Sequence, residues 1–246
     1  MMRCTLAVTA MLLAAPLFAQ SEESERLLLP IFTPPVAGAF GAEFHTDVTV
    51  GNLGRTVLTL TGLAYDCDII LSCPPTPNRI DLQSERVLRS EELVHNGAPG
   101  RFVFLQKEDL RSLTMSLRVH EVTRDALNLG TEMPIVRESE FVNDRIVFPH
   151  VPVFPWYRSA LRIYAASPVD VLVKAGSQLP VRLHLSGAAD PFDPAYAVFT
   201  NFKGVGFARV TVEVDQQNSD TPVPIWAFIT VTNNQTQAIT TITPRP

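Results

Sequence analysis

Apolar and polar residues alternate along several short segments of this chain with a period of two. The clearest of these segments are residues 44–50, 113–119 and 208–214. Because successive side chains of a β-strand point to opposite faces of its sheet, each segment is expected to bury one face and to expose the other. The residues expected to point inward are Phe44, Thr46, Val48, Val50, Leu113, Met115, Leu117, Val119, Ala208, Val210, Val212 and Val214.

Further strands are expected between segments with turn chemistry, such as the Gly-Asn-Leu-Gly sequence of residues 51–54. Residues 82–94 are compatible with a short helix or with a strand, and the strand is favoured because the neighbouring segments are strands. Strands and helices do not alternate, so the pattern predicts an all-β fold of the antiparallel β-sandwich type. The other expected strands cover residues 57–65, 101–105, 159–165, 169–174, 181–185, 196–202, 225–232 and 238–243.

The C-terminal half of the chain repeats the plan of the N-terminal half. Residues 44–50 are echoed in residues 157–163, and residues 115–119 are echoed in residues 227–231, in both cases about 112 positions later. Self-similarity over such a distance is the signature of a duplicated unit. The sequence therefore predicts two tandem antiparallel β-sandwich domains, which cover residues 27–142 and 143–246.

Short motifs occupy corresponding places in the two halves. Phe44-His45-Thr46-Asp47 and Tyr157-Arg158-Ser159-Ala160 each lead into an alternating strand, and residues 231–236 form a polar closing turn. In these motifs the chain resembles a loose class of secreted bacterial proteins built from tandem β-sandwich repeats of immunoglobulin-like architecture. The resemblance covers most of the chain and implies its fold and its export, but it brings no activity. The Cys-Trp-Cys pattern of true immunoglobulin domains is missing.

The first 19 residues have the features of a secretory signal peptide. Arg3 supplies the positive charge, residues 6–18 form a short apolar run, and Ala19 offers a cleavage end. The run is too short to span a bilayer, so a membrane anchor is the less favoured alternative, and no later stretch approaches the roughly 20 apolar residues of a transmembrane helix. We therefore expect an exported protein, periplasmic or extracellular, that begins with a short charged leader at residues 20–26 and has no transmembrane span.

Two cysteines, Cys67 and Cys73, follow the signal segment. In an oxidising compartment they are expected to form a disulfide that closes a short loop. A redox pair and half of a metal site are the alternatives, but redox motifs favour Cys-x-x-Cys and a zinc site requires further ligands nearby. The net charge of −5, without a basic cluster, argues against nucleic acid as a partner.

The chain offers no recognisable catalytic motif. Its five histidines are not spaced as a metal pair, and no Gly-x-Ser-x-Gly sequence marks a nucleophile. Asp66 with Asp68, and Asp190 with Asp193, could share a Ca²⁺ ion, but their spacing matches no EF-hand loop and structural turns are the favoured explanation. We therefore expect no catalytic residue, no metal site and no cofactor. The histidines are His45, His95, His120, His150 and His184, of which the first, third and last are expected to face solvent from strands.

An aromatic cluster stands at the start of the second half. Phe154, Trp156 and Tyr157 lie in a Pro-rich segment, where a hydrophobic plug at the domain junction is the favoured interpretation and stacking against sugar rings is the alternative. Trp226 lies within an expected strand and is assigned to the core. The predicted function is an exported, non-catalytic structural or interaction module with a protein or glycan partner. A carbohydrate-binding module is the alternative, and a secreted hydrolase is the third possibility.

Overall fold

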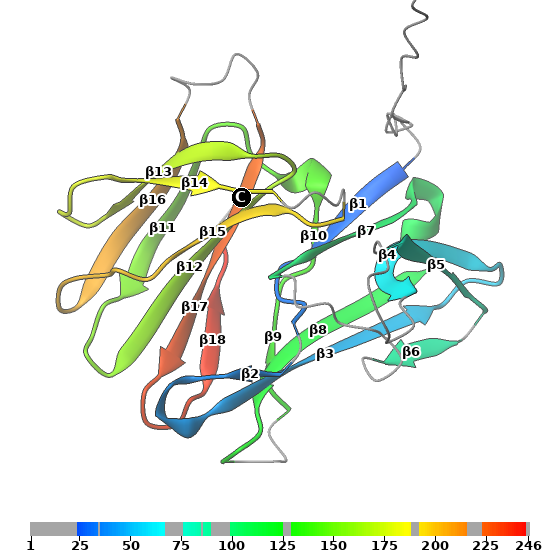
Figure 1. The fold of residues 1–246 in the computed structure, drawn as a ribbon, viewed down its shortest axis with the longest axis horizontal. Coiled ribbons are helices and arrows are strands. Elements are labelled where there is room, and N and C mark those ends of the chain that lie inside the picture. Colours follow the sequence, from blue (N-terminus) through cyan, green and yellow to red (C-terminus); the bar gives the residue numbers. More distant parts are fainter. Residues whose placement is uncertain are drawn as a thin grey trace, which may run out of the picture.

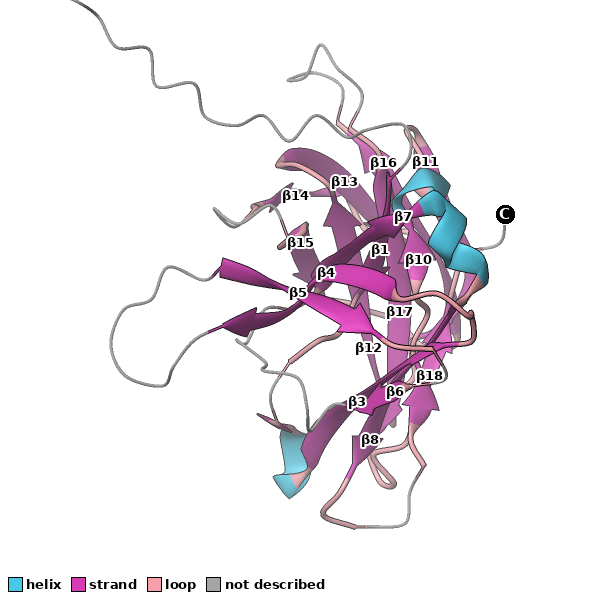
Figure 2. Ribbon diagram, turned by 90° about the vertical axis from the view of Figure 1, so that its right-hand side faces the viewer, coloured by secondary structure: helices cyan, strands magenta, loops and turns pink. Residues whose placement is uncertain are grey.

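The computed structural model describes residues 24–33, 35–66, 76–84, 86–89, 99–124, 129–187, 192–215 and 223–244. Within these residues the protein is all-β, and its helical segments are short 3-10 turns, η1 (Ala39–Gly41), η3 (Lys107–Arg111) and η4 (Glu138–Glu140). Figure 2 shows the helical turns at the margins of a molecule otherwise built from strands. No helix in this part of the chain is long and apolar enough to cross a membrane.

The N-terminal half forms two antiparallel sheets. One sheet has the order β10-β1-β7-β4-β5, and the other has the order β2-β3-β8-β9, with β6 also paired to β3. The strands are β1 (Ser24–Leu29), β2 (Val36–Ala37), β3 (Glu43–Asn52), β4 (Leu58–Asp66), β5 (Thr76–Leu82), β6 (Val87–Arg89), β7 (Arg101–Gln106), β8 (Leu113–Glu121), β9 (Thr131–Glu132) and β10 (Val136–Arg137).

The C-terminal half forms a second pair of antiparallel sheets. Their orders are β11-β16-β13-β14 and β15-β12-β17-β18. Figure 1 shows that β12, β17 and β18 lie on the side of this half that faces the first half. The strands are β11 (Arg145–Pro152), β12 (Tyr157–Ala165), β13 (Val169–Ala175), β14 (Val181–Leu185), β15 (Ala195–Phe199), β16 (Phe207–Val214), β17 (Ile225–Asn233) and β18 (Ile239–Ile242).

The two halves have the same strand order. The path β1-β7-β4-β5 corresponds to β11-β16-β13-β14, and the set β6-β3-β8-β9 corresponds to β15-β12-β17-β18. The register of the central strand pair is also shared, since Phe44 stands opposite Glu121 where Tyr157 stands opposite Asn233. The prediction of a tandem antiparallel β-sandwich is confirmed, and the echoed sequence motifs occupy equal positions in the two halves.

Each half has a buried apolar core that follows the predicted alternation. Val48, Val50 and Leu117 are buried in the first core, and Val210 and Val212 are buried in the second. In β12 the residues with odd numbers, from Ser159 to Ala165, are all buried beneath the second sandwich. The residues with even numbers in β12 and β17 therefore face the other way, toward the first half.

Three aromatic residues of the second half complete the core of the first half. Tyr164 of β12 and both Trp226 and Phe228 of β17 belong to the same buried cluster as Leu28 and Phe32. The rings of Trp226 and Phe228 are stacked with their centroids 5.3 Å apart. Trp226 is thus a core residue, as predicted, and the β15-β12-β17-β18 sheet is buried on both faces at this end.

Polar contacts also join the two halves. The Phe102 N–H donates to the Phe192 carbonyl over 2.6 Å, and the Arg101 guanidinium meets the Asp193 carboxylate over 2.5 Å. The Tyr164 hydroxyl donates to the Pro30 carbonyl. Full burial raises the pKa of Tyr164 above its usual range, which keeps this hydroxyl protonated as a donor. The junction therefore combines apolar packing with buried polar contacts.

Part of the predicted leader is a strand. Residues 24–26 pair with β7 as the first half of β1, and they do not form a free charged segment. Their charges are accommodated because Arg26 forms an ion pair with Glu138, while Glu25 accepts a hydrogen bond from the Ser139 hydroxyl. Residues 20–23 and the predicted signal segment lie outside the described residues.

Two other expectations concern the loops of the first half. Residues 87–89 of the segment 82–94 form β6, which agrees with the preference for a strand over a helix. Cys67 and Cys73 lie outside the described residues, and so does His95. The disulfide therefore stays a prediction.

Gly62→Ala is expected to lower the free energy of unfolding by more than about 1 kcal/mol. Gly62 has φ of +94°, and a Cβ atom there would lie 2.6 Å from the Phe102 carbonyl oxygen and 2.2 Å from the Phe192 ring. Gly206→Ala is the control, because Gly206 has φ of +104° but nothing within 4 Å of a Cβ atom. Chemical denaturation would measure both losses, and equal losses would show that the contact with Phe192 contributes nothing.

Candidate functional site

The predicted aromatic cluster lies in the turn between β11 and β12. The Phe154 and Trp156 rings are stacked with their centroids 5.0 Å apart, and Tyr157 contacts both rings edge-on. Sequence reasoning missed a fourth member, Phe207 of β16, whose ring meets Phe154 edge-on at 5.4 Å. The Trp156 side chain is 52% exposed and that of Phe207 is 65% exposed. The cluster is therefore a surface patch, and the interpretation as a buried plug is wrong for Trp156.

A groove of about 620 Å³ runs beside these rings, and we call it the aromatic groove. The four aromatic residues line it together with polar residues of the β17–β18 hairpin, namely Asn233, Thr236 and Thr240. Val231 and Ile242 add apolar surface from the same hairpin. Aromatic rings with a few hydrogen-bonding groups among them are the combination found in sites for small polar ligands.

Hydrogen bonds hold the turn that carries Trp156. The Asn234 N–H donates to the Trp156 carbonyl over 2.9 Å, and the Asn234 side-chain amide donates to the Pro155 carbonyl over 2.9 Å. The Tyr157 N–H donates to the Phe154 carbonyl over 3.0 Å. The ring faces are therefore presented on a backbone that is already ordered before any ligand binds.

A second groove, of about 510 Å³, lies on the outward face of the β12–β17 pair, and we call it the arginine groove. Its floor consists of Arg158, Ala160 and Arg162 of β12 with Thr230 and Thr232 of β17. Its walls come from residues 152–155, from residues 200–204 and from residues 38 and 39 of the first half. Two parts of the chain that are far apart in sequence thus enclose one groove.

Strand alternation explains why arginines line this groove. Arg158, Ala160, Arg162 and Tyr164 share the face of β12 that points away from the second core. Tyr164 is covered by the first half, whereas Arg158 and Arg162 lie beyond the covered end and are partly exposed. The same sheet face is therefore aromatic and buried at one end, and cationic and open at the other.

Both arginines of the groove are hydrogen-bonded to neutral partners. Arg158 donates to the side-chain oxygens of Asn234 and Gln237 over 2.6 and 2.7 Å, and Arg162 donates to the Thr230 hydroxyl over 2.6 Å. Partial burial, followed by the charge of Arg124, lowers the pKa of Arg158. The two guanidinium groups are therefore stabilised by hydrogen bonds to amide and hydroxyl oxygens and not by ion pairs with the groove lining.

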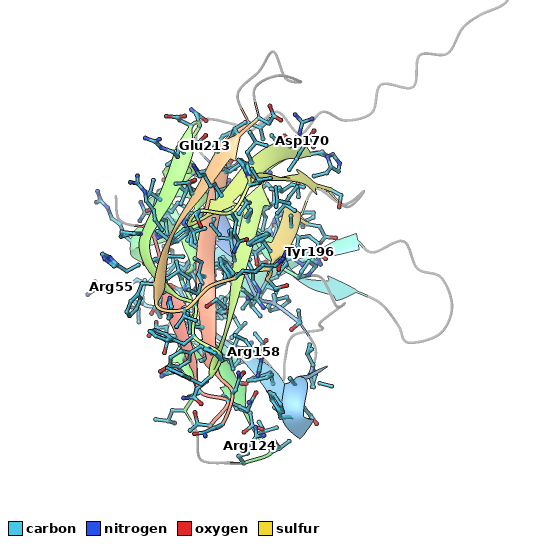
Figure 3. All side chains as sticks on the ribbon, turned by 90° about the vertical axis from the view of Figure 1, so that its left-hand side faces the viewer. Arg55, Arg124, Arg158, Asp170, Tyr196 and Glu213 are labelled. Atoms are coloured by element: carbon cyan, nitrogen blue, oxygen red, sulfur yellow. The ribbon has the colours of Figure 1, made fainter. Side chains whose placement is uncertain are left out.

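A strained residue of the first half supports this arrangement. Phe40 in η1 has φ of +58°, a left-handed conformation that is uncommon for an aromatic residue. The Arg124 guanidinium donates to its carbonyl over 2.9 Å, and the Arg158 guanidinium lies 5.4 Å from the centre of its ring. Figure 3 shows Arg124 and Arg158 at the same end of the molecule. Such strain is typical of backbone that is held in place for a functional reason.

Three of the described histidines form pairs with carboxylates, and none of these pairs involves a residue that lines a groove. His45 lies 2.7 Å from Glu43, His120 lies 3.2 Å from Asp47, and His184 lies 2.8 Å from Asp170. The fourth, His150, is exposed, and its ring lies edge-on to the Phe207 ring at 6.3 Å. His184 is exposed, as predicted, whereas His120 is half-buried beside His45. None of the described residues that line the two grooves is a His, Cys, Asp or Glu.

Only one member of each acidic pair considered for Ca²⁺ lies among the described residues. Asp193 forms the ion pair with Arg101 at the junction, while Asp68 and Asp190 lie outside the described residues. Among the residues that the structure describes, no group of three or more His, Cys, Asp or Glu side chains could hold a metal ion.

No protein-family model, curated protein or solved structure matches this chain. The function is therefore inferred from the two grooves.

Proposed function

We propose that the protein is an exported, non-catalytic binding module that recognises a saccharide at the aromatic groove. The observation that carries the proposal is the half-exposed Trp156 ring, which is stacked on Phe154 and lines a groove that also contains polar side chains. Sugar rings present apolar C–H faces and hydroxyl edges, which such a groove can contact at the same time.

Export is proposed from the pattern of residues 1–19, which carry a basic residue and a short apolar run. The duplicated strand order adds support for a place among secreted bacterial proteins built from tandem β-sandwich repeats. A purely structural module is the weaker proposal, because a structural role does not explain why an ordered turn exposes the large Trp156 ring to solvent.

Trp156→Ala is expected to weaken saccharide binding by about tenfold or more, because a central Trp anchor contributes well over 1 kcal/mol to binding. A glycan array of the exported chain would identify the saccharides, and isothermal titration calorimetry would then measure both affinities. Leu179→Ala is the matched control, because Leu179 is also a large exposed apolar residue and lies outside both grooves. Unchanged affinity in Trp156→Ala, or the absence of any saccharide ligand, would contradict the proposal.

A further inference from the structure

We propose that the arginine groove binds the acidic groups of the ligand, so that the saccharide is an anionic chain of acidic sugars. This inference rests on the proposed function, since it specifies the ligand of the same surface. Three features of the groove carry it, namely its charge, the spacing of its arginines and its continuity with the aromatic groove.

The charge of the groove is uncompensated by its own lining. Arg158 and Arg162 contribute two positive charges, and no acidic side chain is among the described residues that line the groove. Arg124, which approaches from the first half, has Glu121 at 3.8 Å as its partner. The protein as a whole is acidic, with a net charge of −5, so this cationic groove stands apart from the rest of the chain. Guanidinium groups bind carboxylates and sulfates through paired, charge-assisted hydrogen bonds.

The spacing of the arginines favours a chain over a single small anion. Arg158 and Arg162 are four residues apart on the same strand face, so their Cα atoms are about 13 Å apart. The residue between them on this face is Ala160, whose small side chain leaves the floor open. A lone phosphate cannot engage both sites fully, whereas an oligosaccharide with an acid group on successive units can place one group at each arginine.

The two grooves share a common border. Pro152, Phe154 and Tyr157 line both of them. A ligand whose ring stacks near Trp156 can therefore extend across this border and reach Arg158. Arg158 is already oriented by Asn234, Gln237 and the Phe40 ring, which reduces the entropic cost of binding an acid group there.

The test compares acidic oligosaccharides with the same sugars after their acids are esterified. The probes are oligogalacturonate, oligomannuronate and their methyl esters, and the protein is the full exported chain. We expect at least one acid form to bind about tenfold more tightly than its ester, and this preference should fall as the salt concentration rises. The double variant with Arg158→Gln and Arg162→Gln should bind the acid and the ester with similar affinity.

Two further variants test whether the acid preference depends on the arginines of the groove or on positive charge elsewhere on the protein. Arg162→Gln alone leaves the hydrogen bonds of Arg158 in place and should remove part of the acid preference. Arg79→Gln changes an exposed arginine of the first half and should leave the preference unchanged. Equal binding of acids and esters, or an acid preference that survives the double variant, would overturn the inference while leaving saccharide binding intact. Failure of every saccharide to bind would overturn the proposed function itself.

Discussion

Asp193→Asn is expected to lower the free energy of unfolding by about 3 kcal/mol. Arg101 of the first half is fully buried, and its guanidinium meets the Asp193 carboxylate of the second half over 2.5 Å. An amide fills the same space but removes the negative charge of Asp193 from beside a buried cation, which is far costlier than the loss of an exposed pair. Urea denaturation followed by circular dichroism would measure the effect.

The control for this variant is Asp81→Asn, which makes the same chemical change in an exposed pair. Arg79 and Asp81 lie 3.0 Å apart on the surface, where ion pairs contribute at most about 1 kcal/mol. If the free energy of unfolding fell by the same small amount in both variants, the contact between Arg101 and Asp193 would have no special role in joining the halves.

Phe228→Ala is expected to lower the free energy of unfolding by about 3–5 kcal/mol. The Phe228 side chain is fully buried between the halves, where it stacks with Tyr164 and Trp226. Its removal leaves a cavity in a junction that belongs to the core of the first half. The midpoint of the unfolding transition should therefore move to a lower denaturant concentration. Phe207→Ala deletes the same ring from the surface and should cost much less. A loss below about 1 kcal/mol in Phe228→Ala would mean that the junction repacks or contributes little.

Strands with a strict alternation could be predicted from the sequence, as could the continuous apolar segment of β17, whereas some other strands could not. The segments that became β3, β8 and β16 have an apolar residue at nearly every second position, because one face of each is buried. β5 follows soon after the cysteine segment, and its sequence Thr-Pro-Asn-Arg-Ile-Asp-Leu contains few apolar residues, so the alternation did not predict it. The alternation also did not predict a strand over the whole length of β11, because this segment contains two prolines. An edge strand tolerates them, and β11 lies at the edge of its sheet.

The candidate site was predictable only in part. Phe154, Trp156 and Tyr157 stand out because they are adjacent in sequence, whereas Phe207 joins them through the pairing of Pro152 with Phe207 in the β11–β16 ladder. Arg162 and Tyr164 occupy equivalent positions of one strand face, and nothing local distinguishes the open position from the buried one. The difference depends on where the first half ends, which is a property of the tertiary structure.

The shared register of the two halves has a consequence for assembly. Tyr164 stands opposite Trp226 where the first half has Gly51 opposite Thr114, and Phe228 corresponds to Ser116. The first half therefore lacks the aromatic rings through which the second half docks. A third unit stacked in the same direction would meet glycine, serine and threonine in place of an apolar surface. This face of the first half therefore does not favour the apolar head-to-tail contact that joins the two halves, and such a contact is not expected to repeat into a fibre.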